Sequence, residues 1–209
     1  MGKRAQRGLP LKPFVFAAAL LPLVWLAWRG GEGSLGINPI ETVIRFLGDW
    51  ALRFLLIALA VTPLRKVSGW AGVARLRRML GLFAFFYACL HVAAYVGVDQ
   101  FFDWHAIGKD IVKRRFITVG MATMLILLPL AVTSTNAMVK RLGGRRWRAL
   151  HRLVYAAGGL AVLHYFMMVK ADVRMPMLHA ALLAILLGYR GAAAWMERRR
   201  RPVAAALRG

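Results

Sequence analysis

Long apolar runs dominate the chain and predict helices that cross a membrane. Met79–Val98 and Phe116–Val139 contain no charged residue and reach the roughly 20 residues that a spanning helix needs. Leu153–Val169 is also uncharged and reaches the lower limit of about 17 residues. We therefore predict an all-α integral membrane protein with six transmembrane helices, in a single domain over residues 1–209. The other three predicted spans are shorter or carry charges: Pro13–Trp28, Phe46–Leu64 and Met175–Tyr189.

The composition fits a membrane protein better than a soluble one. Hydrophobic residues make up 60% of the chain and charged residues 18%, against roughly 45–50% and 25% in soluble domains. The net charge of +22 by itself suggests a nucleic-acid partner. In so apolar a chain the basic residues act first as topology signals, so we expect a lipid bilayer and no nucleic acid. The single cysteine, Cys89, excludes an internal disulfide, a cysteine-ligated cluster and covalent attachment of haem.

The basic residues predict which way the helices run. If the N-terminus is cytoplasmic, 21 of the 30 lysines and arginines fall in cytoplasmic segments. This asymmetry is the positive-inside pattern of membrane proteins. We therefore predict that both termini are cytoplasmic, with basic tails at about residues 1–12 and 197–209.

Two histidines inside predicted spans lie at the same depth. Histidine in a membrane is costly unless it has a partner, so it indicates a functional site. His91 lies 13 residues beyond Arg78. His164 lies 12 residues beyond Arg152, so both histidines are roughly 18–20 Å from the cytoplasmic ends of their helices. Such a pair can bind one haem iron from both sides. The alternative is two imidazoles that are hydrogen-bonded across the bundle.

Small residues share a helix face with each of these histidines and would leave room for a flat macrocycle. They are Gly81, Ala84 and Ala88 before His91, and Ala157 and Ala161 before His164. Ordinary close packing of membrane helices also favours small residues, so both interpretations stay open.

The remaining histidines are less well placed. His151 precedes His164 by 13 residues, a spacing that suits a second haem or another redox group about 20 Å below the first. Thirteen residues of helix, however, turn His151 about 140° from the His164 face. The third predicted helix has Arg77 rather than histidine at that depth, so an interfacial histidine is the alternative. His105 and His179 have no partner at equal depth, and we interpret them as surface or packing residues.

The charges inside the second predicted helix have two interpretations. Arg45, Asp49 and Arg53 are spaced four apart and share a face. Arg53 is deep enough to meet a haem propionate, whereas an ion pair within the helix is the simpler interpretation. A transporter would need more intramembrane carboxylates than Asp49 alone. No serine stands in a G-x-S-x-G setting and no P-loop is present, which disfavours an intramembrane serine protease and a nucleotide-driven enzyme.

Several short motifs follow one another in a specific order. They are TPL at 62–64, RRMLGL at 77–82, LAVTST at 130–135, LG at 142–143, Trp147, LH at 150–151, Tyr155 and HY at 164–165. Together they resemble the haem-binding membrane subunits of the periplasmic protein-methionine-sulfoxide reductase, which belong to the ferric-reductase-like transmembrane proteins. The resemblance runs through nearly the whole chain.

The resemblance implies an electron-transfer subunit rather than the catalytic subunit of a complex. It implies a ferric-reductase-like helical bundle in the bacterial inner membrane that carries haem b, with FMN as a candidate second cofactor. Electrons would come from a cytoplasmic flavin reductase or the quinone pool. They would pass to a periplasmic molybdopterin-containing subunit that reduces methionine sulfoxide in oxidised proteins. The family's haem-ligand positions fall on His91, His151 and His164.

Two questions stay open after the resemblance. Larger relatives use two histidine pairs, whereas this chain supplies three of the four histidines. The group opposite His151 is therefore a different iron ligand, a flavin or nothing. The chain contains no nicotinamide- or flavin-binding domain, so we expect a separate electron donor.

The alternative functions are a quinol-oxidising cytochrome b of another redox chain, and a non-redox membrane scaffold or transporter in which the histidines are structural.

Overall fold

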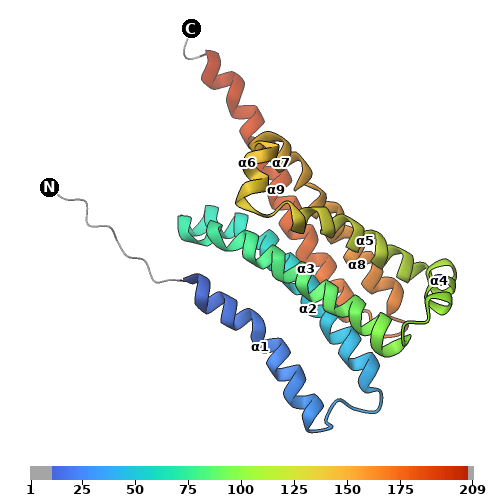
Figure 1. Cartoon of the computed structure of the whole chain (residues 1–209). Coiled ribbons are helices and arrows are strands. Elements are labelled where there is room, and N and C mark those ends of the chain that lie inside the picture. Colours follow the sequence, from blue (N-terminus) through green and yellow to red (C-terminus); the bar gives the residue numbers. More distant parts are fainter. Residues whose placement is uncertain (1–10, 207–209) are drawn as a thin grey trace.

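The computed structural model describes residues 11–206, which are helical almost throughout and contain no strand. This confirms the predicted all-α fold. Long helices run back and forth between the two ends of a helical bundle (Figure 1). They are α1 (Leu11–Gly31), α2 (Pro39–Ser68), α3 (Arg77–Ala94), α5 (Arg115–Val132), α8 (Leu153–Met168) and α9 (Arg174–Ala206). The shorter elements are the 3₁₀ helix η1 (Ala71–Leu76), the π-helical turn η2 (Tyr95–Asp99), α4 (Trp104–Lys113), α6 (Asn136–Leu142) and α7 (Gly144–Leu150).

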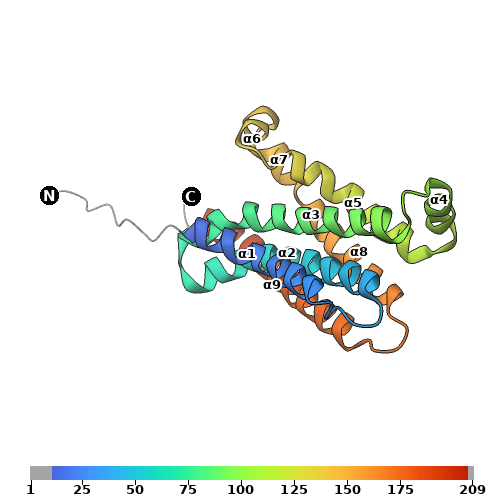
Figure 2. The ribbon, with the colours of Figure 1, turned by 60° about the horizontal axis from the view of Figure 1, so that its bottom comes forward.

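The short helices lie at opposite ends of the bundle. Figure 2 shows α4 at one end, and α6 and α7 at the other end, where α1 begins and α9 ends. This alternation agrees with the predicted order of the helices. The predicted basic tail at 1–12 lies almost wholly outside the described residues, as do residues 207–209. The other predicted tail begins as a continuation of α9, which runs on to Ala206.

Within the described residues, four helical segments have the length and apolar composition of membrane spans. They are Leu11–Gly31, Gly72–Asp99, Arg115–Val132 and Arg174–Glu197. The other two long helices, α2 and α8, are not among these segments; α2 carries charged residues, and α8 has 16 residues. Large apolar side chains are exposed along the candidate spans, among them Phe14, Leu125 and Ile185. Such exposed apolar surface is expected of helices that face lipid, and the count of six spans stays a prediction.

Local sequence signals set the ends of α2. The Asn38 side chain accepts a hydrogen bond from the Glu41 N–H at 3.2 Å, and Pro39 occupies the first helical position. The helix ends at Gly69, whose φ of 69° suits the left-handed conformation that glycine adopts easily. Its 30 residues give a length of about 45 Å, so α2 extends beyond the predicted span Phe46–Leu64 at both ends.

The predicted span Phe116–Val139 is wrong at its second end, because α5 stops at Val132. The Thr133 hydroxyl donates to the Pro129 carbonyl at 2.6 Å, and the Ser134 hydroxyl donates to the Leu130 carbonyl at 2.7 Å. The Pro129 carbonyl also accepts the Thr133 N–H at 3.0 Å, whereas the Ser134 N–H turns to Ala131, so the Ser134 hydroxyl takes its place at the Leu130 carbonyl. The Thr135 side chain then accepts from the Met138 N–H at 3.2 Å and starts α6.

Two pairs of neighbouring helices build the core. α2 packs most extensively against α3, and α5 packs most extensively against α8. Aromatic rings fill the first pair; the Phe54 ring lies 5.1 Å from Tyr87 and 5.6 Å from Phe83, measured between centroids. Tyr87 is fully buried, and its hydroxyl donates to the Ala19 carbonyl at 2.8 Å, which fixes α1 on the outside of the pair.

Arg190 ties three helices together. Pro63 has no N–H to offer the Leu59 carbonyl four residues earlier in α2. Arg190 of α9 fills this gap, because its Nη2 donates to the Leu59 carbonyl at 2.6 Å and to the Thr62 hydroxyl at 2.9 Å. Its Nη1 donates to the Tyr155 hydroxyl of α8 at 2.9 Å. Arg190, which directly follows the predicted span Met175–Tyr189, therefore points into the bundle.

Candidate cofactor site

The structure brings His91 of α3 and His164 of α8 together. Their ring centroids are 6.3 Å apart, and the ring planes are inclined by 81°. Both residues are partly buried and lie near the ends of their helices, on the α4 side of the bundle. The two helices belong to different packed pairs, so the histidines face each other across the interface between the pairs.

A backbone carbonyl holds each imidazole. His91 Nδ1 lies 2.8 Å from the Ile44 carbonyl oxygen of α2, and His164 Nδ1 lies 2.6 Å from the Phe116 carbonyl oxygen of α5. A carbonyl oxygen can only accept, so each Nδ1 carries the proton and donates it. The Nε2 of each neutral ring is then the nitrogen with a free lone pair. This is the state in which histidine binds a metal ion.

The spacing of the rings fits two axial ligands of one iron. A transition-metal–imidazole bond is about 2 Å long and each ring centroid lies roughly 1 Å behind its nitrogen, so two such ligands have centroids about 6 Å apart. The observed separation is 6.3 Å. No group of three or more histidine, cysteine, aspartate or glutamate side chains within residues 11–206 forms a metal site. A haem needs only the two axial ligands, because its macrocycle supplies the other nitrogens.

For two of the small residues near the histidines, the structure favours close helix packing over making room for a macrocycle. Ala84 and Ala157 are almost fully buried and belong to one apolar core cluster. Close packing of the helix pairs therefore explains both alanines. Gly81 differs, because a side chain there would meet no atom within 4 Å.

His151 lies apart from the other two histidines, where α7 ends. Its ring stacks on Trp147 with the centroids 3.9 Å apart, and its Nε2 lies 3.1 Å from the Thr133 hydroxyl. That hydroxyl donates to Pro129, so it accepts from Nε2–H of His151. Burial and the nearby Arg78 cation lower the pKa of His151. His151 therefore makes a side-chain hydrogen bond at the α6–α7 end, whereas His91 and His164 bond to backbone carbonyls at the α4 end. Its role as an iron ligand stays a prediction.

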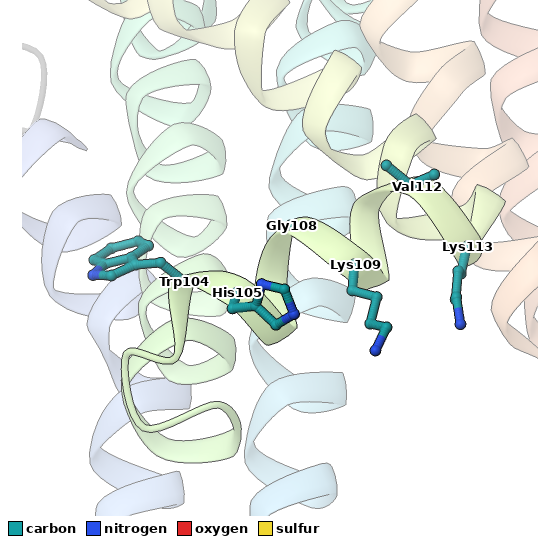
Figure 3. A pocket seen from close by; sticks show the side chains of 6 residues that line it. All are labelled: Trp104, His105, Gly108, Lys109, Val112 and Lys113. Atoms are coloured by element: carbon teal, nitrogen blue, oxygen red, sulfur yellow. The ribbon is translucent and has the colours of Figure 1, made fainter.

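The other predicted candidates have structural contacts. Arg53 Nη2 lies 3.6 Å from Asp49 Oδ2, as the ion-pair interpretation expects, whereas Arg45 pairs with Glu41. His179 is buried, and its Nδ1 lies 2.7 Å from the Met175 carbonyl, which makes it a packing residue. Figure 3 shows His105 beside Lys109 on α4, where six residues line an open pocket.

Sequence reasoning missed the two carbonyls that hold the histidines. A backbone oxygen leaves no mark of its own in a sequence. Each carbonyl is followed four residues later by a glycine, Gly48 in α2 and Gly120 in α5, and this spacing was a usable signal. Trp147 and Arg190 were also missed as contact residues, because aromatic and basic residues near a membrane surface have ordinary roles.

Comparison with known proteins identifies the class of protein to which the chain belongs. Residues 47–162 match the family described as the ferric reductase like transmembrane component. This segment contains His91 and His151 and ends two residues before His164. The chain is thus a multi-pass membrane protein of a family built on helical spans.

Curated relatives define the family more closely. A protein of Rhodospirillum rubrum named "Protein-methionine-sulfoxide reductase heme-binding subunit MsrQ" is 60% identical over 185 residues, which cover 88% of this chain and 89% of that protein. Proteins of the same name from Herminiimonas arsenicoxydans and Caulobacter vibrioides are 52% and 51% identical, over 90% and 88% of this chain and 87% of each relative. The chain therefore belongs to the MsrQ family of ferric-reductase-like transmembrane proteins, which confirms the resemblance drawn from the motifs.

Proposed function

We propose that this chain is the haem-binding, electron-transferring subunit of a methionine sulfoxide reductase system. The observation that carries the proposal is the facing pair His91 and His164, in which both Nδ1 atoms are bound and both Nε2 atoms remain available. The printed names of the relatives, which call them heme-binding subunits, support it. On this proposal the chain makes no bond to the sulfoxide and is not itself the catalytic subunit.

His91 and His164 would hold a b-type haem through their Nε2 atoms. When bound, the haem supplies reversible one-electron redox chemistry. The carbonyls of Ile44 and Phe116 keep the proton on Nδ1 and fix the ring planes. A hydrogen bond of this kind makes the imidazole more basic, which favours the ferric state.

The position of the pair suggests a direction for the electrons. His91 and His164 lie toward the α4 end, whereas the basic helices α6 and α7 lie at the other end (Figure 1). The positive-inside rule makes the α6–α7 end cytoplasmic. Electrons would therefore leave near α4 toward a periplasmic, molybdopterin-containing partner that reduces methionine sulfoxide. On this proposal the protein lies in the inner membrane of a bacterium, with the α4 end toward the periplasm.

His151 would mark the end where electrons arrive, from a cytoplasmic flavin reductase or from the quinone pool. Its Nε2–H is donated to the Thr133 hydroxyl, so Nδ1 is the ring nitrogen with a free lone pair in this tautomer. At the inner end the alternatives are a second haem, an FMN or no cofactor. Counting haem and flavin per chain in the purified protein distinguishes them.

A reduced-minus-oxidised absorption spectrum tests the outer site. We expect a low-spin b-type spectrum in the wild-type protein, its loss in His91→Ala and His164→Ala, and its retention in the control His105→Ala. His105 is an exposed residue of α4 and serves as a matched histidine. The effect of His151→Ala on haem count separates a second haem from another role. A colourless wild-type protein, made with ample haem, would refute the proposal.

A further inference from the structure

Two glycines lie directly against the imidazole rings of the histidine pair. A Cβ atom on Gly48 would stand 3.0 Å from Nδ1 and 3.1 Å from Cε1 of His91. A Cβ atom on Gly120 would stand 3.0 Å from the same two atoms of His164. These distances are tighter than nine in ten real Cβ contacts, so any side chain there must displace the ring by a few tenths of an ångström.

Each glycine follows the accepting carbonyl by one helical turn. Gly48 lies four residues after Ile44, and Gly120 lies four residues after Phe116. In a helix the residue at this spacing lies over the carbonyl on the same face and already donates its own N–H to it. The carbonyl has a second lone pair for the histidine N–H. A side chain at the glycine position would cover that lone pair, whereas glycine leaves it accessible.

The same arrangement occurs in both helix pairs. In α2 and α3 the carbonyl is 47 residues before its histidine, and in α5 and α8 it is 48 residues before. Each ring therefore meets a neighbouring helix backbone at a glycine, with Nδ1 and Cε1 as its nearest atoms. The planes of the two rings are inclined by 81°.

We propose that Gly48 and Gly120 are positioning residues for the iron-binding histidines, which they let dock on the Ile44 and Phe116 carbonyls so that the two imidazole planes stay crossed. This inference rests on the proposed haem site. The glycines touch no haem on this proposal; they act through His91 and His164.

Displacing the His91 or His164 ring would change the redox potential and the EPR spectrum of a bound haem, which a change in helix packing alone would not do. A weaker N–H to carbonyl bond makes the imidazole less basic, which disfavours the ferric state and raises the midpoint potential. The angle between axial imidazole planes also determines the low-spin ferric EPR spectrum. Crossed planes give a strongly anisotropic signal with a large highest g value, and rotating one ring lowers that value.

The test uses the full-length protein in detergent, as wild type and as Gly48→Ala and Gly120→Ala. Matched controls are Gly159→Ala in α8 and Gly188→Ala in α9, two exposed helical glycines where a Cβ meets no atom within 4 Å. We expect 10–100-fold weaker haem binding in Gly48→Ala and Gly120→Ala, the usual size for a lost outer-shell contact to a metal ligand. We also expect a higher midpoint potential, by about 59 mV for each tenfold change in the redox equilibrium, and an altered EPR signal. The controls keep wild-type values.

A second arm covers the case in which a variant loses haem altogether. In the protein made without haem, thermal stability is compared for Gly48→Ala alone and in the His91→Ala background. The three nearest atoms to a Cβ on Gly48 all belong to His91, so the added methyl group should destabilise only while the ring is present.

The outcomes separate this inference from the haem proposal. Coloured alanine variants with wild-type EPR spectra and potentials would overturn the positioning role alone. An equal loss of stability with and without the His91 ring would overturn it as well. A colourless wild-type protein would instead refute the haem site itself.

Discussion

Replacing Arg190 by leucine removes the side chain that satisfies the carbonyl left without a partner by Pro63. Arg190 donates to Leu59, Thr62 and Tyr155, and its contact with Leu59 is the shortest of the three at 2.6 Å. Leucine is apolar and shorter than arginine, and its side chain donates no hydrogen bond. The Leu59 carbonyl then has no partner in a region where water is scarce.

The magnitude follows from these contacts. A hydrogen bond from a charged donor contributes about 1.5–3 kcal/mol, and an acceptor left unsatisfied costs about 1–3 kcal/mol. Arg190 Nε is buried without a partner, a cost that leucine removes, so the three bonds do not add in full. We expect Arg190→Leu to lower the free energy of unfolding by about 2–4 kcal/mol.

A double-mutant cycle with Pro63→Ala tests whether the missing N–H of Pro63 is the reason that Arg190 stabilises the fold. Alanine at 63 restores an N–H that can donate to the Leu59 carbonyl within α2, so Arg190→Leu should cost about 1–2 kcal/mol less in that background. Unfolding in detergent is followed by far-UV circular dichroism for the wild type, both single variants and the double variant. Arg199→Leu is the control, since Arg199 is exposed and stacks on Trp195 of its own helix. An equal cost of Arg190→Leu in both backgrounds would refute the role assigned to Pro63.

Three further predictions concern the core, the ligand and the inner end. Tyr87→Phe removes the hydrogen bond that holds α1 through Ala19, so we expect a loss of about 1 kcal/mol in the same unfolding assay. Haem at 100 times its dissociation constant should raise the stability of the wild type by about 2.7 kcal/mol and leave His91→Ala unchanged, as measured by thermal melts with and without haem. Thr133→Val keeps the shape of the side chain but removes the partner of His151 Nε2, so any spectroscopic signal assigned to His151 should shift while that of the outer pair does not. An unchanged His151 signal would contradict the contact with Thr133.

The sequence predicted the pairing of His91 and His164 because depth in a membrane can be counted along a helix. Both residues lie at matched distances from basic residues at the cytoplasmic ends of their helices, and the structure brings their rings to 6.3 Å. The order of the long helices was predictable for the same reason. Apolar runs and basic loops can be read along the sequence, because the bilayer requires apolar spans and cytoplasmic loops are enriched in lysine and arginine.

Helix ends and side-chain contacts were harder to predict, since they depend on local hydrogen bonds and on how helices meet. At the end of α5, the hydroxyl groups of Thr133 and Ser134 bond to carbonyls of the preceding turn, and hydropathy does not register such bonds. Thr135 before Asn136 was a cap signal for α6 inside the apolar run. The partner of Arg190 depends on Pro63, which is far away in the chain, and becomes evident only when α2 and α9 are placed side by side.

The contrast between the two ends of the bundle bears on how many cofactors the chain holds. At the α4 end both histidines meet a helix backbone in the same way, so the two half-sites are equivalent and their Nε2 atoms are free. At the α6–α7 end His151 has a side-chain partner through Nε2 and a stacked Trp147 on its face. The inner end is therefore not a second copy of the outer site. A cofactor held through Nε2 would replace the Thr133 contact, whereas one held through Nδ1 would leave that contact in place.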